Sequence, residues 1–343
     1  MTHRSFFWFI LPTLSAMLLF IALPIVSVAI QSLFIEHEQV LIVTESCTPF
    51  GCEETTTVDT EASAALSKEQ PLGRFNGLGT YTNRSHLAFG EIGEIWNNSS
   101  NVGEFFGELL DLPFYWALAF TLTYTFVVTP FVLVLGLAIA VGVNNLPKIF
   151  KGPTIFVSLL PMIVTPLVGA LTIFWMVDVD GVIGATLQNI FNDPSLSMKA
   201  STPLVWAMLI VYGIWSSLPF SFIVFYAGLQ TVPKDTIEAA QIDGASKWQR
   251  MVHVVVPHLM PLVVFISLIQ LMDNFRVFEP IISFQAEAHA TSLSWIIFND
   301  LIAAGNPLYG SAGATSVLTI IGVAILLMPV LIRTWRDFNR KAH

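Results

Sequence analysis

Long uninterrupted apolar runs constrain this chain more than any other feature of its sequence. Six segments are apolar over the roughly 20 residues that a helix needs to cross a bilayer core of ~30 Å. They cover residues 6–34, 114–143, 153–177, 204–229, 258–284 and 312–335. Strands of an outer-membrane barrel would instead alternate apolar and polar residues. We therefore predict an all-α, polytopic membrane protein with six transmembrane helices.

Composition supports the same class. Hydrophobic residues make up 54% of the 343 residues and charged residues only 11%, whereas soluble domains usually carry ~25% charged residues. An ordinary cytosolic enzyme is therefore disfavoured. The net charge of -9 argues against a nucleic-acid-binding protein, and the apolar content argues against a disordered regulator. Two cysteines are too few for a disulfide-rich scaffold.

The distribution of basic residues predicts the orientation, because cytoplasmic loops are enriched in Lys and Arg. Only Lys199 falls in a short loop on the opposite side. The basic residues assigned to the cytoplasmic side are Arg4, Lys148, Lys151, Lys234, Lys247, Arg250, Arg333, Arg336, Arg340 and Lys341. Both termini are expected in the cytoplasm of a bacterial cell, with the chain in the inner membrane. We expect the first span to be retained, because its apolar run exceeds that of a signal peptide.

Three regions follow from this topology. Residues 1–34 form the first transmembrane helix, residues 35–113 an exported loop, and residues 114–343 the core with the other five spans. The exported loop holds thirteen of the 24 acidic residues and three of the 15 basic ones, so the acidity of the chain belongs to this segment. Few large apolar residues precede Leu72, and we expect the first half of the loop to be loosely ordered.

Both cysteines lie in the exported loop, in the sequence Cys47-Thr-Pro-Phe-Gly-Cys52. On an oxidising face, a disulfide across the Pro-Gly turn is the favoured interpretation. A pair of free thiols is the alternative. Two ligands at this spacing do not predict a zinc site. The seven histidines show no metal-ligand spacing within a span, so we predict no metal site in this chain.

The loop between the fourth and fifth spans, residues 231–257, has an unusual pattern. Pro233 ends one element, and the acidic residues Asp235 and Glu238 suit the start of a short helix. Gly244 permits a sharp turn after that helix, and Pro257 begins the return into the membrane. The sequence thus predicts a short surface helix, a turn and a re-entry into the bilayer.

This loop resembles the EAA motif of bacterial ABC importer permeases. The matching residues are Glu238-Ala239-Ala240, then Gly244 and Pro257. The Asp243-Gly244-Ala245 core and the preceding Gly-Leu-Gln-x-x-Pro resemble the carbohydrate-uptake branch, which includes maltose and glycerol-phosphate permeases. Further similarity extends over most of residues 72–335, including Tyr81, Gly136, Pro161 and Pro166.

The resemblance implies the type I ABC importer fold and a role in transport rather than catalysis. In the family, the EAA helix docks on a cytoplasmic ATPase, and the implied coupling residues here are Glu238, Ala239, Ala240, Asp243 and Gly244. The chain lacks a Gly-x-x-x-x-Gly-Lys-Ser/Thr phosphate loop. We therefore expect no cofactor in this chain, with ATP and Mg²⁺ bound by a partner ATPase. An ordinary surface helix between two spans is the alternative reading of this loop.

The resemblance also implies partners: a second permease subunit, two ATPase subunits, a solute-binding protein and a sugar substrate. The solute-binding protein would dock on the exported segments 35–113 and 285–311. Within the second of these, the sequence from Ser292 to Ile302 predicts a short amphipathic helix.

Polar residues within spans indicate a substrate path, because buried charges are costly in a bilayer. On the fifth span, polar side chains recur with helical spacing and predict one shared face. By resemblance to sugar permeases with a central site, the path residues are Gly213, Ser216, Ser217, Phe220, Gln270, Asp273, Asn274 and Val277. The related large maltose permease has an aromatic residue at the position of Asp273, which weakens the match there. The alternative is internal pairing, of Asp273 with Arg276 or of Arg276 with Glu279.

Functions of other classes are less well supported. A secondary transporter would show inverted repeats or matching broken spans, and we find no internal repeat. No selectivity-filter pattern of a channel or catalytic motif of an intramembrane enzyme is present in the sequence. The main alternative is an ABC permease for an amino acid, a polyamine or phosphate, and an ion-coupled transporter ranks below it.

Overall fold

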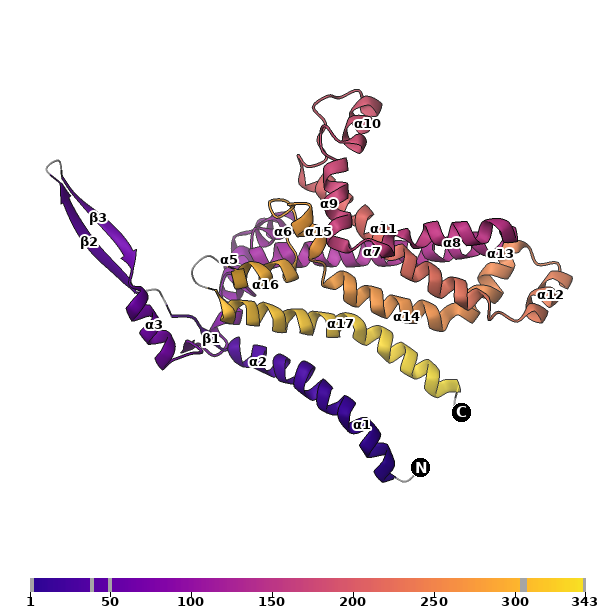
Figure 1. Cartoon of the computed structure of the whole chain (residues 1–343), viewed down its shortest axis with the longest axis horizontal. Coiled ribbons are helices and arrows are strands. Elements are labelled where there is room, and N and C mark those ends of the chain that lie inside the picture. The colour runs from indigo at the N-terminus through magenta and orange to yellow at the C-terminus, as the bar shows by residue number, and fades with distance from the viewer. Residues whose placement is uncertain (1–2, 38–39, 49–50, 303–306, 342–343) are drawn as a thin grey trace. The chain divides into compact units, whose positions relative to one another are not determined.

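The computed structural model describes residues 3–37, 40–48, 51–302 and 307–341 (Figure 1). The chain divides into two compact units. The first consists of Met1–Trp116 and Leu293–Ile321, and the second of Ala117–Ser292 and Gly322–His343. Within the described residues, five helical segments are long and apolar enough to cross a membrane: Phe7–Gln31, Pro113–Asn144, Thr202–Leu229, Lys247–Phe275 and Tyr309–Arg336. A sixth span exists if one bent helix pair is counted as a single span.

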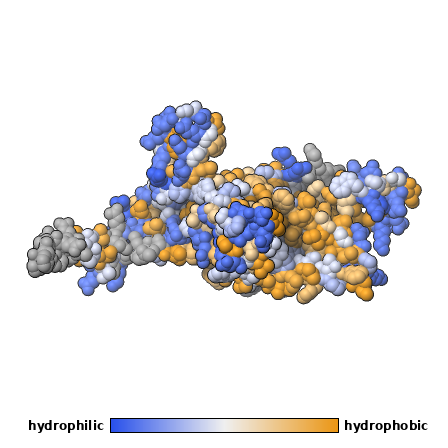
Figure 2. All heavy atoms as spheres, turned by 90° about the horizontal axis from the view of Figure 1, so that it is seen from above, coloured by the Kyte–Doolittle hydropathy of each residue, from blue (hydrophilic) through white to orange (hydrophobic). Residues whose placement is uncertain are grey.

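These helices correspond to five of the six predicted spans. The first is continuous through α1 (His3–Met17), the π-helical turn η1 (Leu18–Ala22) and α2 (Leu23–Gln31). The second is α7 (Pro113–Asn144), the fourth α11 (Thr202–Leu229) and the sixth α17 (Tyr309–Lys341). The fifth is built from α13 (Lys247–Arg250), the π-helical turn η2 (Met251–Val255) and α14 (Val256–Phe275). Figure 2 shows apolar residues over much of the visible helical surface, as expected for helices that face lipid.

The predicted third span, 153–177, is not one straight helix. It consists of α8 (Lys148–Ile163) and α9 (Pro166–Met176), which meet at an angle of 95°. Val164 and Thr165 between them are extended, with ψ values of 126° and 142°. Pro166 explains the break, because a residue before proline is driven out of the helical region and proline lacks the N–H that would continue the ladder.

The predicted fifth span, 258–284, is too long at its C-terminal end. Helix α14 ends at Phe275, and Arg276 already departs from helical geometry with φ -100° and ψ 23°. A separate short helix, α15 (Glu279–Ser283), follows and has Pro280 in its first turn. Because Pro280 cannot donate a backbone hydrogen bond to the preceding turn, the chain leaves one helix and begins another. Val277 therefore lies outside the helical face predicted for it.

The segment 35–113, which the sequence predicts to be exported, is more regular than its composition suggested. Strands β2 (Leu41–Thr48) and β3 (Gly51–Val58) form an antiparallel hairpin, and α3 (Thr60–Glu69) follows it. Asp59 caps α3 by accepting hydrogen bonds from the backbone N–H groups of Glu61 and Ala62, both 3.0 Å long. The expectation of a loosely ordered first half is therefore wrong. Thr and Val residues within both strands favour the extended conformation. The strands lack the regular alternation of apolar and polar residues that would have predicted them.

The other elements between α2 and α7 are two short strands and three helices. Strands β1 (Phe34–Ile35) and β4 (Arg74–Phe75) pair antiparallel. Helices α4 (Gly79–Thr82), α5 (Phe89–Asn98) and α6 (Val102–Leu110) then lead to the second span. The predicted helix near Ser292 is present as α16 (Leu293–Ile302). Strand register places Cys47 opposite Cys52, but both side chains lie outside the described part of the chain, so their disulfide stays a prediction.

The core of the second unit forms where α7, α8, α11 and α14 pack together. It is built on buried side chains that include Phe222, Phe225, Leu259 and Ile266. Two glycines allow the close approach of α7 and α11. A Cβ at Gly136 would lie 2.3 Å from Ser221 Oγ, and one at Gly213 would lie 2.1 Å from Tyr124 Oη. Helix α10 (Val182–Phe191) connects α9 to α11 in the same unit.

Candidate functional site

Helix α12 (Lys234–Ile242) is the short surface helix that the loop sequence predicts. Pro233 stands at its N-cap in an extended conformation, and Asp235 lies in its first turn, where a carboxylate suits the helix dipole. The side chains of Glu238 and Ala239 are exposed and that of Ala240 is half-buried. Ile237 packs against the core cluster of the second unit. One face of α12 is therefore anchored, and the face with Glu238 and Ala239 is open.

Gly244 makes the turn that follows α12. Its φ is +79°, in the left-handed region that favours glycine. Among the described residues, no atom lies within 4 Å of the position that a Cβ would take. Glycine is therefore favoured here by backbone conformation and not by space. The turn is closed by bonds from the backbone N–H of Ala245 to Ala240 O, 3.0 Å, and of Asp243 to Ala239 O, 3.0 Å.

A second short helix continues from this turn. Ser246 and Gln249 form a capping box at the start of α13, with bonds of 3.2 Å and 2.8 Å. This reciprocal arrangement satisfies two N–H groups that would otherwise lack partners. The sequence Ser-Lys-Trp-Gln carries the signal for it. The cap fixes the direction in which the chain re-enters the fifth span through η2 and α14.

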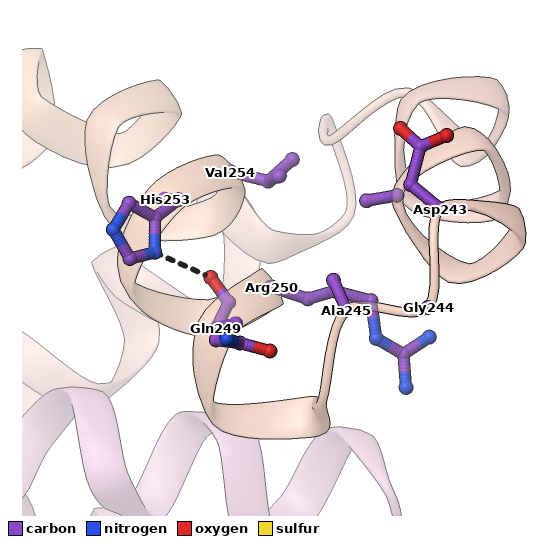
Figure 3. Close-up of a pocket in the computed structure, with 8 residues that line it drawn as sticks. Asp243, Gly244, Ala245, Gln249, Arg250, His253 and Val254 are labelled. Carbon is purple, nitrogen blue, oxygen red and sulfur yellow. Dashed lines mark hydrogen bonds between the residues drawn. The ribbon is translucent and has the colours of Figure 1, made fainter.

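A groove of about 360 Å³ lies between the end of α12 and the start of the fifth span (Figure 3). We call it the loop groove, and its lining residues are Ala240, Asp243, Gly244, Ala245, Gln249, Arg250, His253 and Val254. Arg250 spans it by donating from Nη1 to Gln241 Oε1, 2.9 Å. Within the described residues, Arg250 Nε is buried and has no hydrogen-bond partner. The groove therefore presents a wall of small residues, Ala240, Gly244 and Ala245, while Arg250 Nε stays out of reach of a partner among the described residues.

Two exposed apolar side chains flank the loop groove and were not among the predicted coupling residues. Ile242 is 87% exposed and Trp248 is 75% exposed. Isolated apolar residues are common on surfaces, but a tryptophan beside an open groove is typical of binding hot spots. The sequence signal that could have found them is a large apolar residue on each side of the polar segment from Asp243 to Lys247.

The predicted path residues of α11 do not share one environment. Gly213 is buried against Tyr124, so its small size serves helix packing. Ser216, Ser217 and Phe220 are half-buried, and the Ser216 hydroxyl donates to Gly213 O at 3.2 Å. The ring of Phe220 lies 6.4 Å from that of Phe265 on α14. Only the last three residues therefore keep accessible surface in this chain.

The predicted path residues of α14 separate into buried and exposed groups. Gln270 and Asn274 are buried, whereas Asp273 is exposed and binds Arg276 at 2.8 Å. This ion pair is the internal pairing considered as the alternative. Asn274 Nδ2 donates to Thr129 Oγ1 of α7 at 3.0 Å. Within the described residues, Gln270 Oε1 is buried and accepts no hydrogen bond. Val277 is buried beyond the end of the helix.

Sequence reasoning missed the polar face of α7. Thr121, Thr125 and Thr129 recur every four residues and are buried, so they share one face. The hydroxyls of Thr121 and Thr125 donate to backbone carbonyls one turn earlier, both at 2.7 Å. The hydroxyl of Thr129 instead accepts the hydrogen bond from Asn274. The threonine spacing was visible in the sequence, but the partner helix was not.

An apolar cavity of about 370 Å³ lies between α9, α10 and α11. Leu187, Met198, Val211 and Trp215 are among the residues that line it. None of the predicted path residues lines this cavity or the loop groove. Within the described residues, no group of three or more His, Cys, Asp or Glu side chains is placed to bind a metal ion.

Two polar networks connect loop residues to the helical spans. Lys199 forms an ion pair with Asp178 and lies over the Phe174 ring, 3.3 Å from its centre. The hydrogen bond from Lys199 holds the pKa of Asp178 below its usual value. In the first unit, His86 is fully buried, and its Nε2 lies 3.1 Å from both Ser311 O and Thr315 Oγ1. Burial lowers the pKa of His86 and raises the pKa of nearby Asp300.

Comparisons with known proteins place these features in context. The model of the family described as "Binding-protein-dependent transport system inner membrane component" matches residues 117–337. The trehalose transport system permease protein SugA of Mycobacterium tuberculosis (strain CDC 1551 / Oshkosh) is 31% identical over 226 residues, which cover 66% of this chain and 71% of SugA. The trehalose/maltose transport system permease protein MalF of Thermococcus litoralis is 26% identical over 211 residues, 61% of this chain and 70% of MalF.

A solved structure shares the fold. A chain of a bacterial ABC transporter involved in the import of the acidic polysaccharide alginate superposes with a TM-score of 0.58 and 21% sequence identity. The superposition covers 73% of this chain and 90% of that chain. At this identity the likeness carries the fold alone, and it confirms the fold class predicted from the sequence.

Proposed function

The chain belongs to the family of binding-protein-dependent transport system inner membrane components, and from this premise we propose that it is the permease subunit of an ATP-driven importer of a sugar or sugar-like solute. Family membership confirms the resemblance drawn from residues 238–257, and it makes the chain a multi-pass membrane protein with a transport role. The cargo, the partners and the orientation of the termini are the proposed parts.

The sugar assignment rests on relatives. SugA is named for trehalose, MalF of Thermococcus litoralis for trehalose and maltose, and AraP of Bacillus subtilis for arabinooligosaccharides. The cargoes in these three names are all saccharides, which supports a hydroxyl-rich solute for this chain.

The observation that carries the proposal is the α12 surface. Glu238, Ala239, Asp243 and Gly244 are exposed on a helix and turn that connect directly to the fifth span. Ile237 anchors this helix to the core, so force applied to α12 would reach α11 and α14. We propose that a separate ATPase subunit, which binds ATP and Mg²⁺, docks on this surface and on the loop groove.

The rest of the assembly follows from the same premise. A second permease subunit would complete the translocation path, and two ATPase subunits would dock on the cytoplasmic side. A solute-binding protein would deliver cargo to the exported segments 35–113 and 285–311. The excess of Lys and Arg near α12 and near the end of α17 supports the cytoplasmic assignment of both termini.

We place the solute path along the accessible side chains of α11 and α14: Ser216, Ser217, Phe220 and Asp273. Replacement of Asp273 by Leu should change cargo affinity severalfold, because this exposed carboxylate lies on the proposed path. Assembly should be retained, because the substitution breaks a solvent-exposed ion pair with Arg276.

Replacement of Asn274 by Leu should instead lower stability by about 1–3 kcal/mol, because a buried hydrogen bond to Thr129 is broken. Binding titrations and thermal unfolding of the two variants separate these outcomes.

The decisive experiment is reconstitution. The chain is co-expressed with candidate permease, ATPase and solute-binding proteins from the same cell, and ATPase activity of the purified assembly is measured across a panel of sugars. We expect a stable assembly whose ATPase activity rises with one sugar-loaded binding protein. Stimulation by an amino-acid, polyamine or phosphate binding protein would overturn the sugar assignment. A chain that recruits no ATPase and transports under an ion gradient would overturn the proposal as a whole.

A further inference from the structure

Helices α5 and α6 form a short helical pair that ends next to a membrane span. In α5, the side chains of Phe89 and Trp96 are 59% and 68% exposed. At 100° per residue they lie within about 20° of each other on the helix surface, and Glu91 and Glu94 lie about 140–200° away from them. The exposed apolar residues and the acids therefore occupy opposite faces of α5.

Helix α6 repeats this division. Val102 and Phe106 are 68% and 55% exposed and fall within about 40° of each other on the helix surface. Glu104 and Glu108 lie about 160–240° away. Two successive helices thus present large apolar side chains on one face and two glutamates each on the other. This arrangement is typical of helices that lie in a membrane interface.

The two apolar faces are joined by aromatic contacts. The Trp96 ring lies 5.3 Å from the Phe105 ring, and the Phe105 ring lies 5.6 Å from that of Phe106, both edge to face. The inner residues Ile92 and Ile95 are half-buried, so the helical pair has packing contacts of its own. Trp96 and Phe106 take part in these contacts and still keep 68% and 55% of their surface exposed.

The helical pair directly precedes a span. Helix α6 ends at Leu110 and the span α7 begins at Pro113, so only two residues separate them. Three Cα steps of 3.8 Å reach at most about 11 Å, which keeps the C-terminal end of α6 close to the start of the span. Tryptophan and other aromatic residues are enriched at this depth. The four glutamates would face water, and they give the pair no attraction for anionic lipid.

We propose that the α5–α6 pair lies on the bilayer surface at the start of α7, with Phe89, Trp96, Val102 and Phe106 inserted among the lipids. The occupant of the apolar face is thus lipid, and the attraction is apolar rather than electrostatic. This anchor would fix the exported segment above the membrane. The assignment does not depend on the cargo proposed above, and it requires only that α7 spans the membrane.

The test is site-directed spin labelling of the full chain, co-assembled with its partners in phosphatidylcholine nanodiscs. In a background of C47S with C52S, single cysteines replace Trp96 or Phe106 on the apolar face and Glu94 or Glu108 on the acidic face. Phe20→Cys within the first span and Glu61→Cys in α3 serve as the lipid and water references. Relaxation by oxygen and by a water-soluble nickel complex is measured at each label.

We expect the oxygen-to-nickel ratio at positions 96 and 106 to exceed that at 94 and 108 severalfold and to approach the value at position 20. Equal, nickel-dominated values at all four positions would overturn the proposal, because the apolar face would then lie in water. Shielding of 96 and 106 from both reagents in the assembly, but not in the isolated chain, would also overturn it and would indicate a protein partner.

A second measurement avoids cysteine variants. Tryptophan emission of the native assembly is compared with that of Trp96→Phe in nanodiscs with and without brominated phosphatidylcholine. The difference between the two proteins reports Trp96 alone. We expect that difference signal to be quenched at least twofold by the brominated lipid. A difference signal that is unaffected by bromine would contradict insertion.

Discussion

At the scale of single residues, glycine and polar side chains set how closely the helices approach. Gly213 admits the Tyr124 hydroxyl to within a distance that no Cβ could tolerate, and Gly136 does the same for Ser221. Asn274 and Thr129 join α14 to α7 by a buried hydrogen bond. In a bilayer, such small residues and interhelical hydrogen bonds replace the hydrophobic effect as the source of helix association.

Replacement of Gly213 by Ala should therefore destabilise the chain. A Cβ at this position would lie 2.1 Å from Tyr124 Oη, and relief by helix displacement costs about 1–3 kcal/mol in a packed core. Gly142→Ala is the matched control on α7, because no described atom lies within 4 Å of its Cβ position. Thermal unfolding in detergent measures both. Tyr124→Leu removes both the hydroxyl oxygen and the ring carbon Cζ, which lies 2.6 Å from the same Cβ position, and should reduce the loss caused by Gly213→Ala. An equal loss in that background would contradict the packing explanation.

The buried His86 predicts a pH dependence of stability. Burial lowers its pKa from 6.5, so the unfolded chain binds a proton that the folded chain does not. The stability contributed by neutral His86 is therefore fully present above about pH 6.5 and is lost as the pH falls below that value. Asp300 acts in the opposite sense, because its raised pKa favours protonation in the folded state.

Unfolding midpoints between pH 5 and pH 8 test this dependence. We expect the midpoint of the native chain to fall on acidification, a smaller fall in His86→Gln and a larger fall in Asp300→Asn. The last expectation has two causes, since Asp300 also raises the pKa of His86 by charge interaction. An unchanged pH dependence in His86→Gln would show that another group is responsible.

At the scale of elements, helix α12 and its turn contain residues with two different roles. One residue is needed for the backbone conformation, and others are available for contact with a partner. Gly244 is fixed by its positive φ, with free space around it. The side chains of Glu238 and Ala239 are exposed, so packing within the described part of the chain does not explain their identity. Residues that are free in the isolated subunit are the ones expected to meet a partner.

Substitutions at Gly244 separate backbone strain from size. Gly244→Val places a β-branched residue in the left-handed region, at a cost of about 1–2 kcal/mol, and should reduce uptake by at least tenfold. Gly244→Asn should retain most uptake, because Asn tolerates that region. Transport into cells, normalised to the amount of chain in the membrane, measures both. Equal uptake in the two variants would contradict a role for the turn conformation.

Charge reversal on α12 tests the docking face itself. Glu238→Lys should uncouple ATP hydrolysis from uptake, because it reverses a charge on the face proposed for the ATPase. Thr236→Lys introduces the same charge about 200° away around the helix and is the matched control. Uptake and ATPase activity of the reconstituted assembly are compared. Loss of uptake in both variants alike would indicate a general effect of charge, and not a docking face.

At the scale of the whole molecule, the bent pair α8–α9 decides how many times the chain crosses the membrane. If the pair is one broken span, six crossings place both termini on one side. If the pair is re-entrant, five crossings place the termini on opposite sides. The 95° bend permits both readings by length and composition, and the positive-inside distribution of Lys and Arg favours six.

Topology reporters distinguish these cases. Fusions that fluoresce only in the cytoplasm or act only when exported are placed after Asn145, Ser197, Gln230 and Gln285 and at the C-terminus. Six crossings predict the order inside, outside, inside, outside, inside. Five crossings would reverse every position after Asn145. A fusion after Gln70 should report the exported side in both cases and serves as the control.

Local apolar runs and short-range motifs were enough to predict the fold class, five of the six spans, the surface helix at 234–242 and the family. The turn at Gly244 and the α16 helix were equally local. That Gly213 serves packing and that Asn274 bonds Thr129 could not be read from the sequence, since each depends on which helices lie together. The pair of Asp273 and Arg276 was one of two local alternatives, and the folded helix end selected it. The breaks at Pro166 and Pro280 fall between these cases. The prolines were visible in the sequence, but an apolar run alone cannot say whether a helix continues through a proline, bends or ends there.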